Sequence, residues 1–126
     1  MIADFLTILR NGIMRSKSSV TSCYSKVRFN LASILKEEGF ITDVFVEEEG
    51  GRKTIRVVLK YVDGESVIHE IKRVSKPSRR IYAGVDSIKP VIGGLGVSIL
   101  TTSQGFITDK TAKQQRIGGE LVCTVW

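Results

Sequence analysis

The sequence predicts an α+β fold made of two small lobes. Apolar residues recur at helical spacing near the start of the chain and then, from Ile41, at every second position, as in half-buried strands. Proline and serine break the strand pattern at Ser75-Lys76-Pro77-Ser78, where basic charge rises. We therefore expect an α/β lobe with two helices and three strands over residues 1–73, and a mainly β lobe with a short helix over residues 74–126. The 126 residues, 42% of them hydrophobic, suffice for a packed core.

The first lobe is expected to place two helices on one face of an antiparallel sheet. Apolar residues from Ile2 to Ile13 form the stripe of a first helix, and Ser25 can cap a second helix that Gly39 ends. The strands are expected at Ile41–Glu48, Thr54–Tyr61 and Ser66–Arg73, with turns at Gly50-Gly51 and Asp63-Gly64 and a further short strand at Val20–Tyr24.

The second lobe is expected to be built around a buried strand, Val97–Thr102, which has apolar residues on both faces. Thr108 can cap a short helix over Asp109–Gln115, which Gly118-Gly119 is expected to end. The remaining elements are a short strand at Arg80–Tyr82, a turn or single helical turn at Ser87–Lys89 and a closing strand at Leu121–Trp126.

The net charge of +6 is unevenly distributed along the chain. Residues 1–30 carry five basic residues and one acid (+4), residues 31–70 five and nine (−4), and residues 71–126 nine and three (+6). A protein that binds a polyanion concentrates its basic residues on particular surfaces, whereas charge that serves only solubility is spread over the whole surface. Charge alone leaves two readings open: a nucleic-acid partner, or ordinary solvated faces.

Residues that many enzymes and metalloproteins need are scarce in this sequence. His69, the only histidine, alternates with Val67 and Ile71 along a predicted strand, which favours a structural role over that of a general base. Cys23 and Cys123 are too few for the disulfide framework of a small secreted domain, and Cys123 is expected to be a small buried residue. We expect no catalytic residue, no metal and no cofactor.

Three further segments exclude other classes of protein. Gly93-Gly94-Leu95-Gly96 precedes a strand instead of opening a helix, so it predicts a tight turn and no dinucleotide site. The uncharged stretch Pro90–Thr108 is too rich in glycine and hydroxyl residues for a membrane helix. Asp4 and Arg10 interrupt the start of the chain, which has no signal-peptide pattern. We expect a soluble protein in a reducing cytosol.

Two loops of the second lobe carry the most informative chemistry. Ser75-Lys76-Pro77-Ser78-Arg79-Arg80-Ile81-Tyr82 places three cations and two hydroxyls beside an aromatic ring. Thr101-Thr102-Ser103-Gln104-Gly105 ends a buried strand, which would hold its hydroxyls and amides rigidly at the surface. Structured RNA is recognised through phosphates, 2′-hydroxyls and splayed bases, and hydroxyl side chains both donate and accept hydrogen bonds. Both loops are therefore typical of an RNA-binding surface.

The order of several segments adds to this interpretation. They are Ile2-Ala3-Asp4, Leu9-Arg10-Asn11-Gly12, Leu35-Lys36-Glu37-Glu38-Gly39-Phe40-Ile41, Arg73-Val74-Ser75-Lys76-Pro77, Arg80-Ile81-Tyr82, Gly94-Leu95-Gly96 and the block from Thr102-Ser103 to Gly118-Gly119-Glu120. The last block is the most specific, because a hydroxyl-rich loop, Gly, Thr-Asp, a short basic helix and Gly-Gly-Glu follow one another. Over essentially its whole length the chain resembles the family of bacterial-type small-subunit ribosomal protein number eight.

The resemblance implies a primary RNA-binding protein of the small ribosomal subunit and no enzyme. It implies binding to the central domain of 16S-type RNA, a role in organising the subunit platform, and contacts with neighbouring ribosomal proteins, numbers five and twelve. Some members also bind the messenger of their own operon and repress its translation. The implied location is the small subunit in the cytoplasm or in an organelle, with no membrane partner.

Carried over position by position, the resemblance also implies a set of RNA-binding residues. For Glu120 two roles stay open, because a carboxylate can accept from base amino groups or orient a nearby loop. The family pattern is not fully kept: Thr101 stands where Ser is usual, Ser78 and Arg79 replace a Gly-x pair, and Ile8 replaces a frequent Arg. The expected RNA-binding residues are Thr101, Thr102, Ser103, Gly105, Ser75, Lys76, Pro77, Arg80, Tyr82, Glu120, Arg10 and Asn11.

Overall fold

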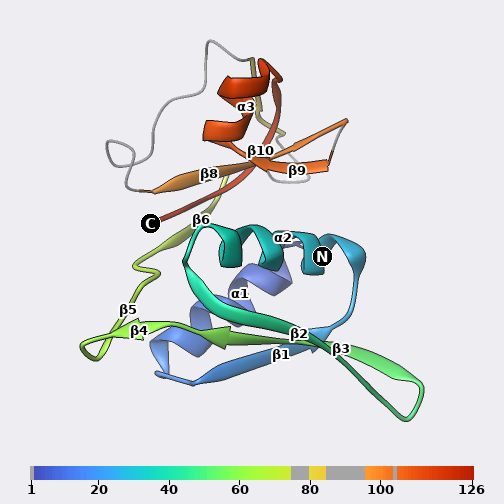
Figure 1. Ribbon diagram of the computed structural model, residues 1–126, viewed down its shortest axis with the longest axis vertical. Coiled ribbons are helices and arrows are strands. Elements are labelled where there is room, and N and C mark those ends of the chain that lie inside the picture. The colour runs from blue at the N-terminus through green and yellow to red at the C-terminus, as the bar shows by residue number, and fades with distance from the viewer. Residues whose placement is uncertain (1, 75–79, 85–95, 104) are drawn as a thin grey trace. The chain divides into compact units, whose positions relative to one another are not determined.

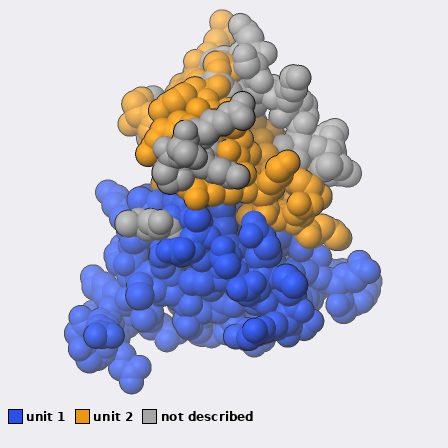
Figure 2. All heavy atoms as spheres, turned by 180° about the vertical axis from the view of Figure 1, so that it is seen from behind, with its two compact units in different colours: residues 1–68 blue, residues 69–126 orange. Residues whose placement is uncertain are grey.

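The computed structural model describes residues 2–74, 80–84, 96–103 and 105–126. Its contacts divide the chain into two compact units, residues 1–68 (unit 1) and residues 69–126 (unit 2), which Figure 2 distinguishes by colour. The α+β class predicted from the sequence is confirmed. None of the helices in the described ranges is long and apolar enough to cross a membrane.

Unit 1 is a three-stranded antiparallel sheet with two helices on one face (Figure 1). The strand order is β1-β3-β2, so that β3 is central and β2 is an edge strand. The elements are α1 (Ile2–Met14), β1 (Ser19–Cys23), α2 (Lys26–Glu37), β2 (Ile41–Glu49) and β3 (Arg52–Leu59), followed by a small hairpin of β4 (Tyr61–Val62) and β5 (Glu65–Ser66).

The core of unit 1 lies between the helices and the central strand. Phe5, Leu9, Leu31 and Leu35 from the helices are fully buried, as are Ile55 and Val57 of β3. Such burial of large apolar side chains is the main stabilising term for a lobe of this size. The predicted cap at Ser25 is confirmed, since its side chain accepts from the backbone N–H of Arg28 at 3.1 Å.

Unit 2 is an antiparallel sheet in the order β6-β10-β8-β9, with β7 also paired to β10. One face of β8, β9 and β10 is covered by α3, whose Ala112 packs with Leu100, Ile107 and Leu121 (Figure 1). Thr108 caps α3, as predicted, by accepting from the N–H of Thr111 at 3.3 Å. The elements are β6 (Ile71–Arg73), β7 (Tyr82–Ala83), β8 (Val97–Thr102), β9 (Gly105–Thr108), α3 (Asp109–Gln115) and β10 (Gly119–Val125).

The strand predicted at Ser66–Arg73 is wrong as a third strand of the first sheet. That place is taken by β1, which pairs with β3 from Ser19↔Val58 to Cys23↔Thr54. The end of the predicted strand forms β6, which pairs with β10 instead. The division at residues 73 and 74 stays a prediction, although the contacts of the described chain separate after Ile68.

The predicted end of the third helix also differs from the structure. The sequence predicts that Gly118-Gly119 ends it, but Arg116 adopts the left-handed conformation (φ 54°) and its backbone N–H donates to carbonyls of the last turn. Gly119 instead begins β10. The segments predicted at Ser87–Lys89 and Gly93-Gly94-Leu95-Gly96 lie outside the described residues.

Candidate nucleic-acid interface

Strand pairing brings four residues of unit 2 into one row across the sheet. Glu120 of β10 lies opposite Tyr82 of β7 on one side and opposite Thr101 of β8 on the other, and Thr101 lies opposite Phe106 of β9. Directly opposed residues of antiparallel strands share a face, and the neighbours Leu121, Leu100 and Ile107 face α3. The row Tyr82–Glu120–Thr101–Phe106 therefore lies on the face away from α3, and we call it the open face.

An ion pair fixes the middle of the open face. The Arg80 Nη1 donates to Glu120 Oε1 at 2.8 Å and to Oε2 at 3.3 Å. The Glu120 side chain is only 10% exposed, whereas that of Arg80 is 61% exposed. The hydrogen bond to Glu120 raises the pKa of Arg80 further above its usual range. Of the two roles left open for Glu120, this geometry favours orientation of a neighbour over direct contact with a base.

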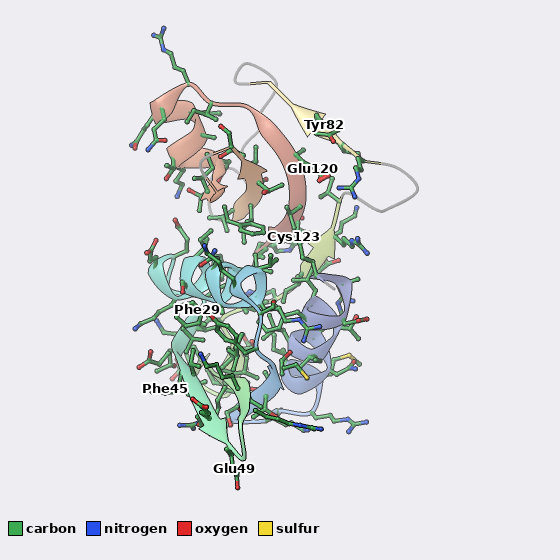
Figure 3. The ribbon with its side chains drawn as sticks, turned by 90° about the vertical axis from the view of Figure 1, so that its right-hand side faces the viewer. Phe29, Phe45, Glu49, Tyr82, Glu120 and Cys123 are labelled. Atoms are coloured by element: carbon green, nitrogen blue, oxygen red, sulfur yellow. The ribbon has the colours of Figure 1, made fainter. Side chains whose placement is uncertain are left out.

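Tyr82 is the aromatic residue that the open face presents to solvent. Its side chain is 70% exposed, and Figure 3 shows it close to Glu120 on β7 and β10. An exposed ring beside a guanidinium supplies a stacking surface and a cation within one short segment, which suits an unstacked base and its phosphate.

The predicted hydroxyl residues do not share one face. Side chains alternate along a strand, so Thr101 belongs to the open face and Thr102 to the opposite one. The Thr102 Oγ1 donates to the carbonyl of Gly105 at 3.0 Å and thereby ties β8 to β9 at the turn. Ser103 follows in the turn and is exposed. Gly105 has φ 103°, a conformation in which side chains are strained, so a glycine is required there.

Gly119 is a contributor that sequence reasoning missed. A Cβ built at Gly119 would lie 2.5 Å from the carbonyl oxygen of Thr101 and 2.8 Å from Thr102 Cγ2. The absence of a side chain therefore lets β10 lie close to the end of β8, where Glu120 meets Thr101. The sequence predicts a helix end for the Gly-Gly pair, and only its position before Glu120 points to a part in this site.

Arg10 and Asn11 are both exposed on α1, in unit 1. Asn11 lines a groove of about 340 Å³ together with Arg15, Lys17 and hydroxyl residues of β1. This groove offers two cations and several hydrogen-bonding groups to an anionic ligand. The predicted residues Ser75, Lys76 and Pro77 lie outside the described residues.

The charge of the chain is concentrated in the unit that carries the open face. Unit 2 has nine basic and four acidic residues, a net charge of +5, whereas unit 1 has ten and nine, a net charge of +1. Such an excess attracts polyanions without regard to sequence.

Two residues considered for chemistry on the sequence have other surroundings. Cys123 is fully buried, as predicted, and burial raises the pKa of its thiol to about 12. His69 is exposed and lies in the irregular segment before β6, not within a strand, and the structural role expected for it stays a prediction.

Comparison with known proteins shows the family of the chain. A family model described as ribosomal protein S8 matches residues 1–126. The small ribosomal subunit protein uS8 of Geobacter sulfurreducens is 49% identical over 126 residues, covering 99% of this chain and 96% of the relative. Those of Limosilactobacillus fermentum and Shewanella amazonensis are 48% and 45% identical, covering 99% and 98% of this chain and 96% and 95% of the relatives. The chain belongs to the ribosomal protein S8 family.

Proposed function

We propose that this chain is a structural constituent of the small ribosomal subunit that binds the subunit's RNA directly through the open face and the β8–β9 turn. The observation that carries the proposal is the cross-strand row in which an exposed Tyr82, the Arg80–Glu120 pair and Thr101 meet beside the Ser103 turn. Family membership supports the proposal, since the relatives are named as small-subunit proteins.

Binding is proposed to use two physically distinct contributions. The excess of basic residues in unit 2 releases counterions from phosphates and supplies attraction that is independent of sequence. The ordered row then discriminates: Tyr82 stacks on a base or ribose, Arg80 donates to phosphate or base edges, and the hydroxyls of Thr101 and Ser103 bond to 2′-hydroxyls. Glu120 acts through Arg80, because their hydrogen bonds hold the guanidinium in one orientation.

The finer proposals rest on the family resemblance of the sequence. The RNA target is proposed to be the central domain of 16S-type RNA, and the role to be organisation of the platform during assembly. Neighbouring ribosomal proteins numbers five and twelve are the proposed protein partners, and the messenger of the chain's own operon is a second RNA target. The proposed location is the small subunit in the cytoplasm or in an organelle, and no catalysis is proposed. Sedimentation with small subunits separates this role from that of a stand-alone translational regulator.

The test compares binding of the full chain to its cognate RNA and to a random duplex of equal length. Thr101→Val combined with Ser103→Ala should weaken binding to the cognate RNA much more than to the duplex, because these are the hydroxyls assigned to the RNA. Thr101→Ser is the matched control, because it keeps the hydroxyl on the open face, and Thr102 is left unchanged because its hydroxyl donates to Gly105. Equal losses on both RNAs would show that the loop contributes only sequence-independent contacts to the RNA backbone, and would overturn the proposal for this site.

A further inference from the structure

The helix α3 carries a group of basic side chains outside the site described above. Lys110, Lys113 and Arg116 are all exposed, and they make up three of the six basic residues that unit 2 has within its described ranges. They lie on the side of the sheet away from the open face, because α3 covers the opposite face of β8, β9 and β10. Figure 3 shows α3 and the labelled Tyr82 on opposite sides of β10. We call Lys110, Lys113, Gln114 and Arg116 the α3 face.

The helix and the strands beneath it carry no exposed carboxylate in the described ranges. Asp109 is the only acid of α3, and it is 4% exposed and accepts from the backbone N–H of Ser98 at 3.4 Å, so it points to the sheet. Strands β8 and β9 have no charged residue, and Glu120 of β10 lies on the open face with Arg80. The residues of unit 2 outside the described ranges add three basic residues and one acid, again an excess of positive charge.

Helix stability does not account for the first of these cations. The N-terminal end of a helix carries a partial positive charge, so it favours acids such as Asp109 and disfavours cations. Lys110 is the second residue of α3 and lies in this first turn, whereas Lys113 lies in the last turn, where a cation is favourable. Lys110, Lys113 and Gln114 are three and four positions apart, so they share one side of the helix. A cation kept at the unfavourable end, beside a second one, indicates an anionic ligand.

We propose that the α3 face binds the phosphate backbone of RNA, at a stretch different from the one held by the open face. The inference rests on the proposed function, because it takes the same class of partner. Cations attract phosphates whatever the base sequence, and the Gln114 amide can donate to a phosphate or 2′-hydroxyl oxygen. A helix with its side chains is about 10–12 Å across, so helix and sheet together separate the two faces. Unit 2 thus connects two stretches of RNA.

The composition of the α3 face favours RNA over a protein or a membrane. A helix that docks into a protein groove or lies on a membrane presents apolar side chains at spacings of three and four residues. The only apolar residue of α3 is Ala112, which is fully buried against the sheet. A second copy of the chain that docked by the same face would bring cations against cations. Phosphates need only the cations and amides that this face presents.

Photo-cross-linking in small subunits identifies the ligand of the α3 face. The full chain carries a benzophenone-bearing phenylalanine at Gln114, or at Gly84 beside the open face, and is incorporated into small subunits in cells before illumination. Replacement of Gln114 leaves the three cations in place, and a Cβ at Gly84 meets no atom of the described residues within 4 Å. Position 114 should cross-link to an RNA stretch distinct from that found from position 84. Cross-links from position 114 to a protein, to a second copy, to the same RNA stretch or to nothing would each overturn the inference.

Removal of the three charges measures how much the α3 face contributes to RNA binding. Each phosphate contact adds about 0.7–0.9 to the slope of log affinity against log salt concentration. Lys110→Gln with Lys113→Gln and Arg116→Gln should therefore lower this slope by about two to three for the cognate RNA. An unchanged slope would show that these cations contact no phosphate, and would overturn the inference.

A matched control removes the same charges from unit 1. Lys26→Gln with Arg52→Gln and Lys60→Gln also replaces two lysines and one arginine, all at exposed positions. Its slope should change by less than about one, because screening weakens the effect of charges that contact no phosphate. A slope change equal to that of the α3 variant would show a general effect of net charge and overturn the inference.

The outcomes keep this inference distinct from the proposed function. A chain that cross-links to RNA from position 84 but not from position 114, and whose salt slope does not depend on the α3 cations, would refute only the α3 face. A chain that is incorporated but cross-links to RNA from neither position would refute the proposed function.

Discussion

Replacing Gly119 by alanine tests whether the close approach of β10 to β8 builds the open face. The added Cβ would lie 2.5 Å from the backbone oxygen of Thr101, about 1 Å inside ordinary contact. No side-chain rotation relieves a clash with backbone, so β10 must move away where Glu120 pairs with Thr101. Overpacking of this kind costs about 1–3 kcal/mol. The lower flexibility of alanine in the unfolded chain returns somewhat less than 1 kcal/mol.

Urea unfolding monitored by tryptophan fluorescence measures this cost in unit 2. Trp126 is the only tryptophan of the sequence, and its backbone N–H donates to the carbonyl of Glu70, which also belongs to unit 2. The midpoint should fall in Gly119→Ala with little change in slope. Gly84→Ala is the matched control, since a Cβ there meets no atom of the described residues within 4 Å and the backbone is not left-handed. Its stability should change by less than about 0.5 kcal/mol.

RNA binding supplies the second readout for the same pair of variants. In buffer without urea, at a temperature where both variants are folded, Gly119→Ala should bind its RNA about tenfold more weakly than Gly84→Ala, because the Thr101–Thr102 end of β8 is displaced. Equal stabilities would refute the packing argument. Unequal stabilities with equal RNA affinities would show that the end of β8 does not contact RNA.

Three other outcomes are expected. Tyr82→Ala should weaken RNA binding by about 1–3 kcal/mol in a filter-binding or calorimetric assay while leaving the unfolding midpoint unchanged, and a loss of stability instead would show that the ring packs internally. If unit 2 neutralises about five phosphates, affinity should fall by two to three decades between 50 and 200 mM salt, and a flat salt profile would contradict that mechanism. Cys23 should react with iodoacetamide in the folded protein at pH 8, whereas Cys123 should react only on unfolding. Since burial raises the pKa of Cys123 to about 12, its thiol stabilises the folded state at every pH below the unfolded pKa near 9, and this contribution to the free energy of unfolding is lost as the pH rises from 9 to 12.

Sequence patterns predicted the locally determined parts of the fold. The caps at Ser25 and Thr108 depend on a side chain bonding an amide three residues away, so a few neighbouring residues decide them. The buried strand Val97–Thr102 could also be predicted from the sequence, because a strand with apolar residues on both faces is stable only in the interior.

Strand partners were harder to predict, because they depend on residues distant in sequence. The pattern around Ser66–Arg73 fits any sheet, and nothing within it shows that β6 pairs with the last strand of the chain. The same limit applies to the candidate site. Arg80 and Glu120 are 40 positions apart, so their pairing could not be read from either segment. The alternation that separates Thr101 from Thr102 was available, but only the observed register shows which of them shares a face with Tyr82.

The buried carboxylate of Glu120 explains how a basic surface can also be a selective one. An Arg80–Glu120 pair has no net charge, so it adds little to the attraction of phosphates that other basic residues of unit 2 supply. What the pair contributes is order: a guanidinium held by two carboxylate oxygens loses less side-chain freedom when it binds a ligand. Loss of Glu120 would therefore remove discrimination between RNAs more than total affinity, whereas loss of unpaired surface lysines would do the reverse. Attraction and recognition are separable on the open face because different side chains carry them.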